Sequence, residues 1–153
     1  MTNYYESPEG RLFVDPILAN HTGLTSITEA QFNEKLAARN KPTSDQLLQQ
    51  LTQARKEQER QGVTINGIRY GGDPSNRQAL REAVAFMDDA GLTEFPKWKC
   101  SDNEFYLNHP LVDVSYAYRA VGMRRVALIG AEGQYAAQIT AGTLTDLSEV
   151  VWP

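Results

Sequence analysis

The chain of 153 residues has only one cysteine and two histidines. Its one cysteine, Cys100, excludes a disulfide within the chain, and two histidines without paired cysteines fit no zinc-binding spacing. No apolar run approaches the roughly 20 residues that span a bilayer, and the polar first residues do not resemble a secretory signal. We therefore expect a protein made in a cytoplasm, with no metal, no cofactor and no membrane contact.

The sequence also lacks an excess or a cluster of positive charge. The formal net charge is −4, and Arg124-Arg125 is only a pair of basic residues. A nucleic-acid binder usually carries Lys and Arg clustered on one face or along one helix. Nucleic acid is therefore not an expected partner.

Sequence motifs of catalysis are missing as well. The glycine-rich stretch "GIRYGGD" lacks the lysine and the spacing of a phosphate-binding loop, and no nucleophile-elbow or zinc-protease pattern occurs. One arrangement stays open, with Cys100 as a nucleophile and His109 as its base across a hairpin. A lone cysteine near a tryptophan is more often a small apolar filler, which is the interpretation we favour. We predict no catalytic residue and no enzyme, with a small cysteine-dependent hydrolase as a remote alternative.

The sequence does contain clear hairpin signals. Residues 63–70, "VTINGIRY", predict a hairpin, because Asn66-Gly67 can supply the two positive φ angles of a type I′ turn. A second hairpin is expected over 96–108, around the turn residues "SDNE". A small hairpin is also expected over 3–14, where Pro8-Glu9-Gly10 has turn chemistry.

Four helices are expected, and two of them have strong start signals. Thr28 and Gln31 have the spacing of a capping box, and Asp73-Pro74 supplies a cap followed by a first-turn proline. The last helix should break into two or three pieces, since several glycines interrupt it. The expected ranges are 29–39, 44–61, 74–90 and 110–140, with Gly122, Gly130 and Gly133 in the last.

Together these elements predict an α+β fold. Edge-to-edge pairing of the two later hairpins would give a small four-stranded antiparallel sheet packed against helices. The expected parts are an N-terminal β-hairpin with a short helix (1–41), a connecting helix (42–61) and a C-terminal α+β domain (62–153). Beyond Ala54 the connecting helix is wholly polar, so this half is either solvated, which is the commoner case, or covered by a partner.

The order of the motifs resembles that of bacteriophage tail proteins. Residues 55–153 are similar to a phage domain of unknown function, and the phrase "LTSITEAQF" from Leu24 is similar to the opening of tail-fibre assembly proteins. The resemblance implies a phage setting, in the host cytoplasm during assembly and then in the virion tail. It supplies no catalytic residues. The motifs that carry it are "GVTINGIRYGGDPSNRQALREAV", "FPKWKCSDNEFYLNHP", "VDVSYAYRAVGMRR" and "ITAGTLTDLSEVVWP".

Two functions follow from this resemblance. One is a structural tail protein, a tail-fibre or baseplate-associated subunit or adaptor that acts through protein–protein contacts. The other is a tail-fibre assembly chaperone that is absent from the mature virion. The implied partners are tail-fibre or other tail proteins, and self-association of the chain stays open.

Candidate partner-binding residues come from both ends of the chain and from the polar helix. Tyr4, Tyr5 and Trp152 are candidates because aromatic residues are enriched at interface hot spots. In the polar half of the 44–61 helix the candidates are Arg55, Lys56 and Glu59, which a partner could cover.

Overall fold

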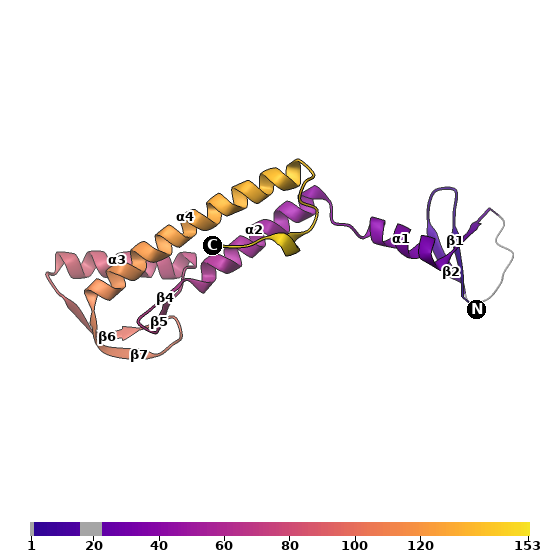
Figure 1. Ribbon diagram of the computed structural model, residues 1–153. Helices are drawn as coiled ribbons and strands as arrows, with labels where there is room; N and C mark the ends of the chain where they lie inside the picture. The colour runs from indigo at the N-terminus through magenta and orange to yellow at the C-terminus, as the bar shows by residue number, and fades with distance from the viewer. Residues whose placement is uncertain (1, 16–22) are drawn as a thin grey trace. The chain divides into compact units, whose positions relative to one another are not determined.

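The computed structural model describes residues 2–15 and 23–153 and divides the chain into two compact units. The first unit is Met1–Thr43 and the second is Ser44–Pro153 (Figure 1). Helices and small antiparallel sheets make up the fold, which confirms the predicted α+β class. The helix predicted over 44–61 packs within the second unit.

The first unit is a three-stranded antiparallel sheet with one helix. The helix begins at the predicted capping box, in which the Gln31 backbone N–H donates to Thr28 Oγ1 at 3.2 Å. The buried Phe32 side chain packs against the Tyr4 ring, with 4.9 Å between ring centroids. The strand order is β2-β1-β3, and the elements are β1 (Asn3–Glu6), β2 (Leu12–Asp15), β3 (Thr25–Ile27) and α1 (Glu29–Arg39).

The second unit contains two hairpins that remain separate two-stranded sheets, so the expected four-stranded sheet was wrong. Asn66 and Gly67 adopt φ angles of 52° and 80°, as the predicted type I′ turn requires. The hairpins meet through a turn instead, because the Gly71 N–H donates to Ser101 Oγ at 2.6 Å and Arg69 pairs with Asp102. The strands are β4 (Val63–Ile65), β5 (Ile68–Tyr70), β6 (Glu94–Lys99) and β7 (Phe105–Pro110).

The regular alternation of side chains along β6 is interrupted at Pro96. The ladder pairs Phe95 with His109 and then Lys97 with Leu107, so it skips Pro96, whose nitrogen cannot donate a hydrogen bond. Simple alternation would place Phe95 and Trp98 on opposite faces, yet both are partly buried against the same core. The inner face is therefore rich in aromatic side chains, while the outer face carries Lys97, Lys99, Phe105 and Leu107.

The helix α4 (Leu111–Thr140) is continuous over 30 residues, so the expected break into pieces was wrong. A glycine inside a helix costs about 1 kcal/mol relative to alanine. Burial of Val114, Val121 and Leu128 on one side of α4 outweighs that cost, because each buried aliphatic side chain contributes about 1.5–3 kcal/mol. The three glycines have open space around them, so they interrupt no packing contact.

The helices α2 (Ser44–Gln61) and α4 run side by side, and α3 (Pro74–Asp89) lies along the first part of α4 (Figure 1). A short 3-10 helix, η1 (Leu147–Glu149), follows. Buried residues form two clusters, one under the hairpins and one where the start of α2 meets the end of α4. The first is Ile68, Tyr70, Leu80, Cys100, Val114, Ala117 and Val121, and the second is Leu47, Leu51, Ile139 and Leu144.

Candidate functional site

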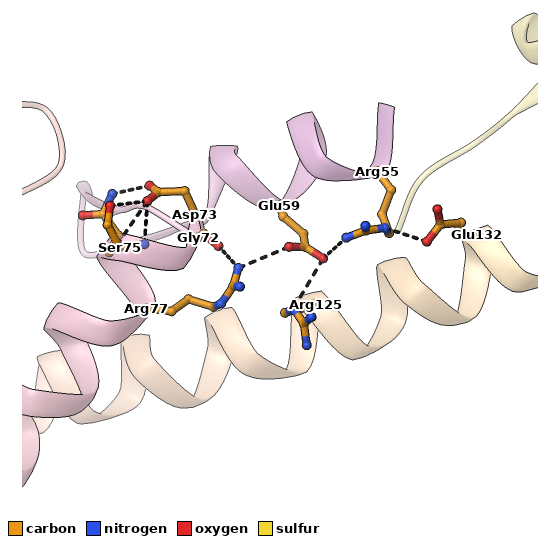
Figure 2. A network of polar contacts seen from close by, with 9 residues as sticks. Arg55, Glu59, Gly72, Asp73, Ser75, Arg77, Arg125 and Glu132 are labelled. Atoms are coloured by element: carbon orange, nitrogen blue, oxygen red, sulfur yellow. Dashed lines mark hydrogen bonds and ion pairs between the residues drawn. The ribbon is translucent and has the colours of Figure 1, made fainter. Parts of the chain in front are cut away.

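The polar half of α2 carries a buried carboxylate. Glu59 is 7% exposed and is surrounded by three guanidinium groups from three helices (Figure 2). Arg55 of α2 contacts Oε1, Arg77 of α3 lies 3.2 Å from Oε2, and Arg125 of α4 lies 3.5 Å from Oε1. A buried charge is tolerated when it is paired and hydrogen-bonded, and here it ties α2, α3 and α4 together.

Arg55 extends the network to a second carboxylate. Its Nη1 contacts Glu59, while its Nε lies 2.6 Å from Glu132 Oε2 on α4. The Arg55 side chain is 13% exposed, so both ion pairs are shielded from solvent. In the polar half of α2, Arg55 and Glu59 are thus held by α3 and α4 of the same chain. Lys56 remains exposed.

Two glycines bring the end of α2 against the strand β5. A Cβ atom at Gly72 would lie 2.1 Å from the Glu59 carbonyl oxygen, and one at Gly62 would lie 1.8 Å from the Tyr70 carbonyl oxygen. Gly62 also has a φ of 68°, which ends the helix in left-handed geometry. Arg77 donates to the Gly72 carbonyl, so the same side chain that binds Glu59 also fixes this backbone.

Asp73 follows directly and caps α3. Its Oδ1 accepts from the backbone N–H groups of Ser75 at 3.0 Å and Asn76 at 3.1 Å, as the sequence predicts (Figure 2). Desolvation acts to raise the pKa of Asp73, but the hydrogen bonds from Ser75 and Asn76 outweigh it and lower the pKa to about 2. Asp73 is therefore ionised over the whole physiological range of pH.

These side chains line an open groove of about 470 Å³. Its cations outnumber its anions, although the protein as a whole carries a formal net charge of −4. Arg60 is 68% exposed and Arg125 is 44% exposed, so with the exposed Lys56 they can contact an acidic group of another molecule. The basic residues that line the groove are Arg55, Lys56, Arg60, Arg77 and Arg125, and the acidic ones are Glu59 and Asp73.

The second candidate arrangement, Cys100 with His109, lies in the core. Cys100 is 6% exposed, just beyond β6 rather than within it, and belongs to the apolar cluster under the hairpins. This is the position that an apolar filler would occupy. The Tyr70 hydroxyl lies 2.7 Å from Nε2 of His109, which is 4% exposed.

The His109–Tyr70 pair is held in its neutral form. Desolvation lowers the pKa of His109, and the negative charge of Asp113 only partly opposes this effect. Desolvation, followed by the charge of Asp113, raises the pKa of Tyr70 to about 12. A neutral imidazole can accept the hydrogen bond of the Tyr70 hydroxyl, so the pair satisfies two buried polar groups within the aromatic core.

The aromatic candidates are partly used in packing. Tyr4 is half-buried against Phe32, and desolvation together with a hydrogen bond to Glu29 raises the pKa of the Tyr4 hydroxyl. Tyr5 is half-buried in β1 and pairs with Phe13 of β2. Trp152 packs edge-on against the Tyr135 ring, with 6.3 Å between centroids, at the second core cluster.

Sequence reasoning selected Arg55 and Glu59 but missed their partners on the other helices. Arg77, Arg125 and Glu132 are far away in the sequence, so nothing local points to them. One signal was present: Arg125 and Glu132 flank the buried Leu128 on α4, where charged residues would otherwise face a neighbouring helix. Oppositely charged residues on α2 are the partners that such positions require.

The described residues contain neither a metal-binding cluster nor a membrane-spanning helix. Within 2–15 and 23–153, no three side chains of His, Cys, Asp or Glu are grouped so that they could hold a metal ion. His21 lies outside these ranges. In the same part of the chain, no helix is both long and apolar enough to cross a membrane.

Comparison with known protein families gives a match to the second unit. A family model described as "Domain of unknown function (DUF4376)" matches residues 42–151. The chain belongs to this family. The DUF4376 region begins just before α2 and includes both hairpins, α3, α4 and η1, so the Glu59 network lies entirely within it. No curated protein and no solved structure matches the chain significantly.

Proposed function

We propose that this DUF4376 protein is a structural subunit of a bacteriophage tail, a tail-fibre or baseplate-associated adaptor that acts through protein–protein contacts. The observation that carries the proposal is the division of the chain into two compact units, each with large apolar side chains on its surface. An adaptor needs two separate contact surfaces, and exposed apolar patches often mark protein–protein interaction sites.

The first unit presents apolar side chains from its sheet and from its helix. Phe13 and Val14 of β2 are 42% and 51% exposed, and Leu36 of α1 is 39% exposed. A sheet this small buries little apolar surface of its own. Contact with another protein would remove these side chains from water and stabilise the unit.

The second unit presents the outer face of the β6–β7 ribbon. Leu107 is 73% exposed and Phe105 is 57% exposed, with the Lys97 ammonium 4.6 Å from the Phe105 ring centroid. Aromatic and aliphatic side chains framed by lysines resemble the core and rim of a protein–protein interface. The exposed cations of the Glu59 groove favour acidic groups on the partner.

The tail setting is supported by resemblance. Residues 55–153 are similar to a phage tail domain and overlap the DUF4376 match. The phrase "LTSITEAQF" covers β3 and the start of α1 in the first unit. That phrase also favours a second candidate function, a tail-fibre assembly chaperone that leaves before the virion is complete.

Mass spectrometry of purified virions of a phage that encodes this chain distinguishes the two functions. An adaptor is expected in virions at a fixed ratio to the other tail proteins. Its absence from virions contradicts the adaptor. If omission of the chain then also makes the co-expressed tail fibre insoluble, the chaperone is the function that remains.

A matched pair of variants tests the role of the β6–β7 surface. Leu107→Asp should remove the chain from virions without lowering its melting temperature, because the side chain is exposed. Phe86→Asp is the control, since Phe86 on α3 is 66% exposed but lies off the ribbon. Equal incorporation of both variants would exclude the ribbon as a docking surface.

A further inference from the structure

One face of α4 is apolar and exposed along its first half. Val112, Tyr116, Met123 and Val126 are 69%, 61%, 69% and 65% exposed. With Arg119 between them, their spacing along the helix alternates between four and three residues. This is the seven-residue repeat of helices that pack against each other as a coiled coil.

The same face continues through the second half of α4 with small residues. Gly130, Gly133 and Ala137 follow at the same alternating spacing. A Cβ atom added at Gly130 or Gly133 would meet nothing within 4 Å, so the helix surface there is open and flat. The exposed face of α4 thus has a first half with large side chains, the bulky half, and a second half with small ones, the flat half.

We propose that this face pairs with the same face of a second copy of the chain, the two α4 helices running antiparallel about a two-fold axis between residues 124 and 125. In this register each large side chain faces a small residue of the second copy, except near the axis, where two apolar side chains of similar size face each other. Val112 faces Ala137 of the second copy, Tyr116 faces Gly133, Arg119 faces Gly130, and Met123 faces Val126.

The complementarity of the two halves selects this arrangement. A parallel pair would place Tyr116 against Tyr116, Arg119 against Arg119 and glycine against glycine, which combines crowding, like-charge repulsion and voids. The antiparallel register separates the two Arg119 side chains and puts bulk against glycine. A two-fold interface uses the same surface on both copies, so this face of α4 is the only surface that the dimer requires.

The flat half has room for the incoming side chains. An open groove of about 410 Å³ lies over Gly130, between α4 and the C-terminal segment, with Tyr135 and Trp152 in its walls. In the proposed register, Arg119 of the second copy enters this groove beside Trp152. A guanidinium stacks favourably on an aromatic face, which gives the partly buried Trp152 ring a role.

The area that the proposed pairing buries is near the lower limit for a specific dimer. The paired segment 112–137 is about 39 Å long at 1.5 Å per residue. From their exposed fractions, Val112, Tyr116, Met123 and Val126 would remove roughly 470 Å² per copy from water. Arg119 and the flat half must supply the rest of the roughly 600 Å² per copy that the smallest specific interfaces bury. We expect a dissociation constant on the order of 1–10 µM. The proposal concerns the chain by itself and does not rest on a role in phage tails.

Sedimentation equilibrium of the full chain tests the dimer. At about 100 µM, well above the expected dissociation constant, the mass should be twice the 17.1 kDa of one chain. Met123→Glu should weaken association at least tenfold, because it places two carboxylates near the two-fold axis. Phe86→Glu, an equally exposed position on α3, should leave association unchanged. A monomeric wild type, or a Met123→Glu variant that still dimerises, overturns the proposal.

Disulfide cross-linking tests the register. The double variant Tyr116→Cys, Gly133→Cys should form covalent dimers on mild oxidation, whereas each single variant should not. The buried Cys100 is common to all three proteins and serves as the background. Cross-linking by Tyr116→Cys alone would show a parallel pair, and no cross-linking by the double variant would show a different surface. Either result contradicts the antiparallel register.

Discussion

The two ends of α2 are held against the rest of the second unit in different ways. At one end Leu47 and Leu51 pack against Ile139 and Leu144, and at the other Glu59 is paired with arginines. Apolar packing is insensitive to direction, so it fixes how close the helices lie. Ion pairs depend on the position of each atom, so the Glu59 end fixes the register of α2 against α3 and α4.

The largest effect should come from removing the central carboxylate. Glu59→Ala leaves three guanidinium groups without their shared partner, and breaking a buried ion pair in this way costs about 3–5 kcal/mol. Urea denaturation measures the free energy of unfolding. Glu57→Ala is the control, because Glu57 is 53% exposed and its pair with Arg60 should contribute less than about 1 kcal/mol. Similar losses for both variants would mean that the Glu59 end is no stronger than a surface pair.

The apolar end should respond slightly less. Leu51 is 1% exposed, and Leu51→Ala should lower the free energy of unfolding by about 3 kcal/mol through lost burial and a cavity. This loss should be the same at low and high salt, whereas the effect of Glu59→Ala should shrink as salt screens Arg125, which is 44% exposed. Equal salt dependence of the two variants would remove the distinction between the ends.

A side chain at Gly72, where the end of α2 contacts the backbone beyond β5, should destabilise the fold. Gly72→Ala puts a methyl group against the Glu59 carbonyl, and we expect a loss of about 2 kcal/mol in denaturant unfolding as the helix end is displaced. Gly122→Ala is the matched control. Its surroundings are open and it lies inside α4, so it should instead stabilise the protein by about 0.5–1 kcal/mol. A neutral Gly72→Ala would show that the backbones can separate freely.

The smallest effect should be that of the α3 cap, and it should depend on pH. The pKa of Asp73 is lowered to about 2 in the folded protein, so its contribution is fully present above about pH 4. It is lost as pH falls through about 2. At pH 7, Asp73→Ala should cost about 1 kcal/mol.

Acid titration of stability isolates this contribution. The difference between wild type and Asp73→Ala should shrink between about pH 4 and pH 2. Asp73→Asn keeps a capping side chain without a charge, so its difference from Asp73→Ala should not change with pH in this window. A constant difference for the wild type as well would contradict the lowered pKa.

Local signals in the sequence predicted the parts of the fold that depend on neighbouring residues. The Asn66-Gly67 turn, the Thr28 capping box and the Asp73 cap each need only a few adjacent positions, and each is confirmed. The continuity of α4 could not be predicted in this way. It depends on burial against other elements, which outweighs the preference of its glycines for irregular structure.

The same limit applies to the candidate site. The sequence of α2 beyond Ala54 is equally typical of a solvated helix and of a helix held by ion pairs. Arg55 and Glu59 could therefore be selected as candidates, but their contacts could not be predicted. Their partners Arg77 and Arg125 come from other helices, and only the assembled fold brings them together. The separation of the two hairpins is likewise set by Ser101, whose hydroxyl binds the backbone beyond β5.

The contact between Gly72 and the end of α2 limits which substitutions this sequence can accept during evolution. Every point mutation at Gly72 adds at least one carbon atom where the Glu59 carbonyl already lies, so lineages that keep this bend have a single residue available there. The glycines on the surface of α4 are under no such restriction from the fold of one chain. Retention of Gly130 and Gly133 among relatives would thus record selection by a neighbour, whereas retention of Gly72 would record selection by the backbone itself.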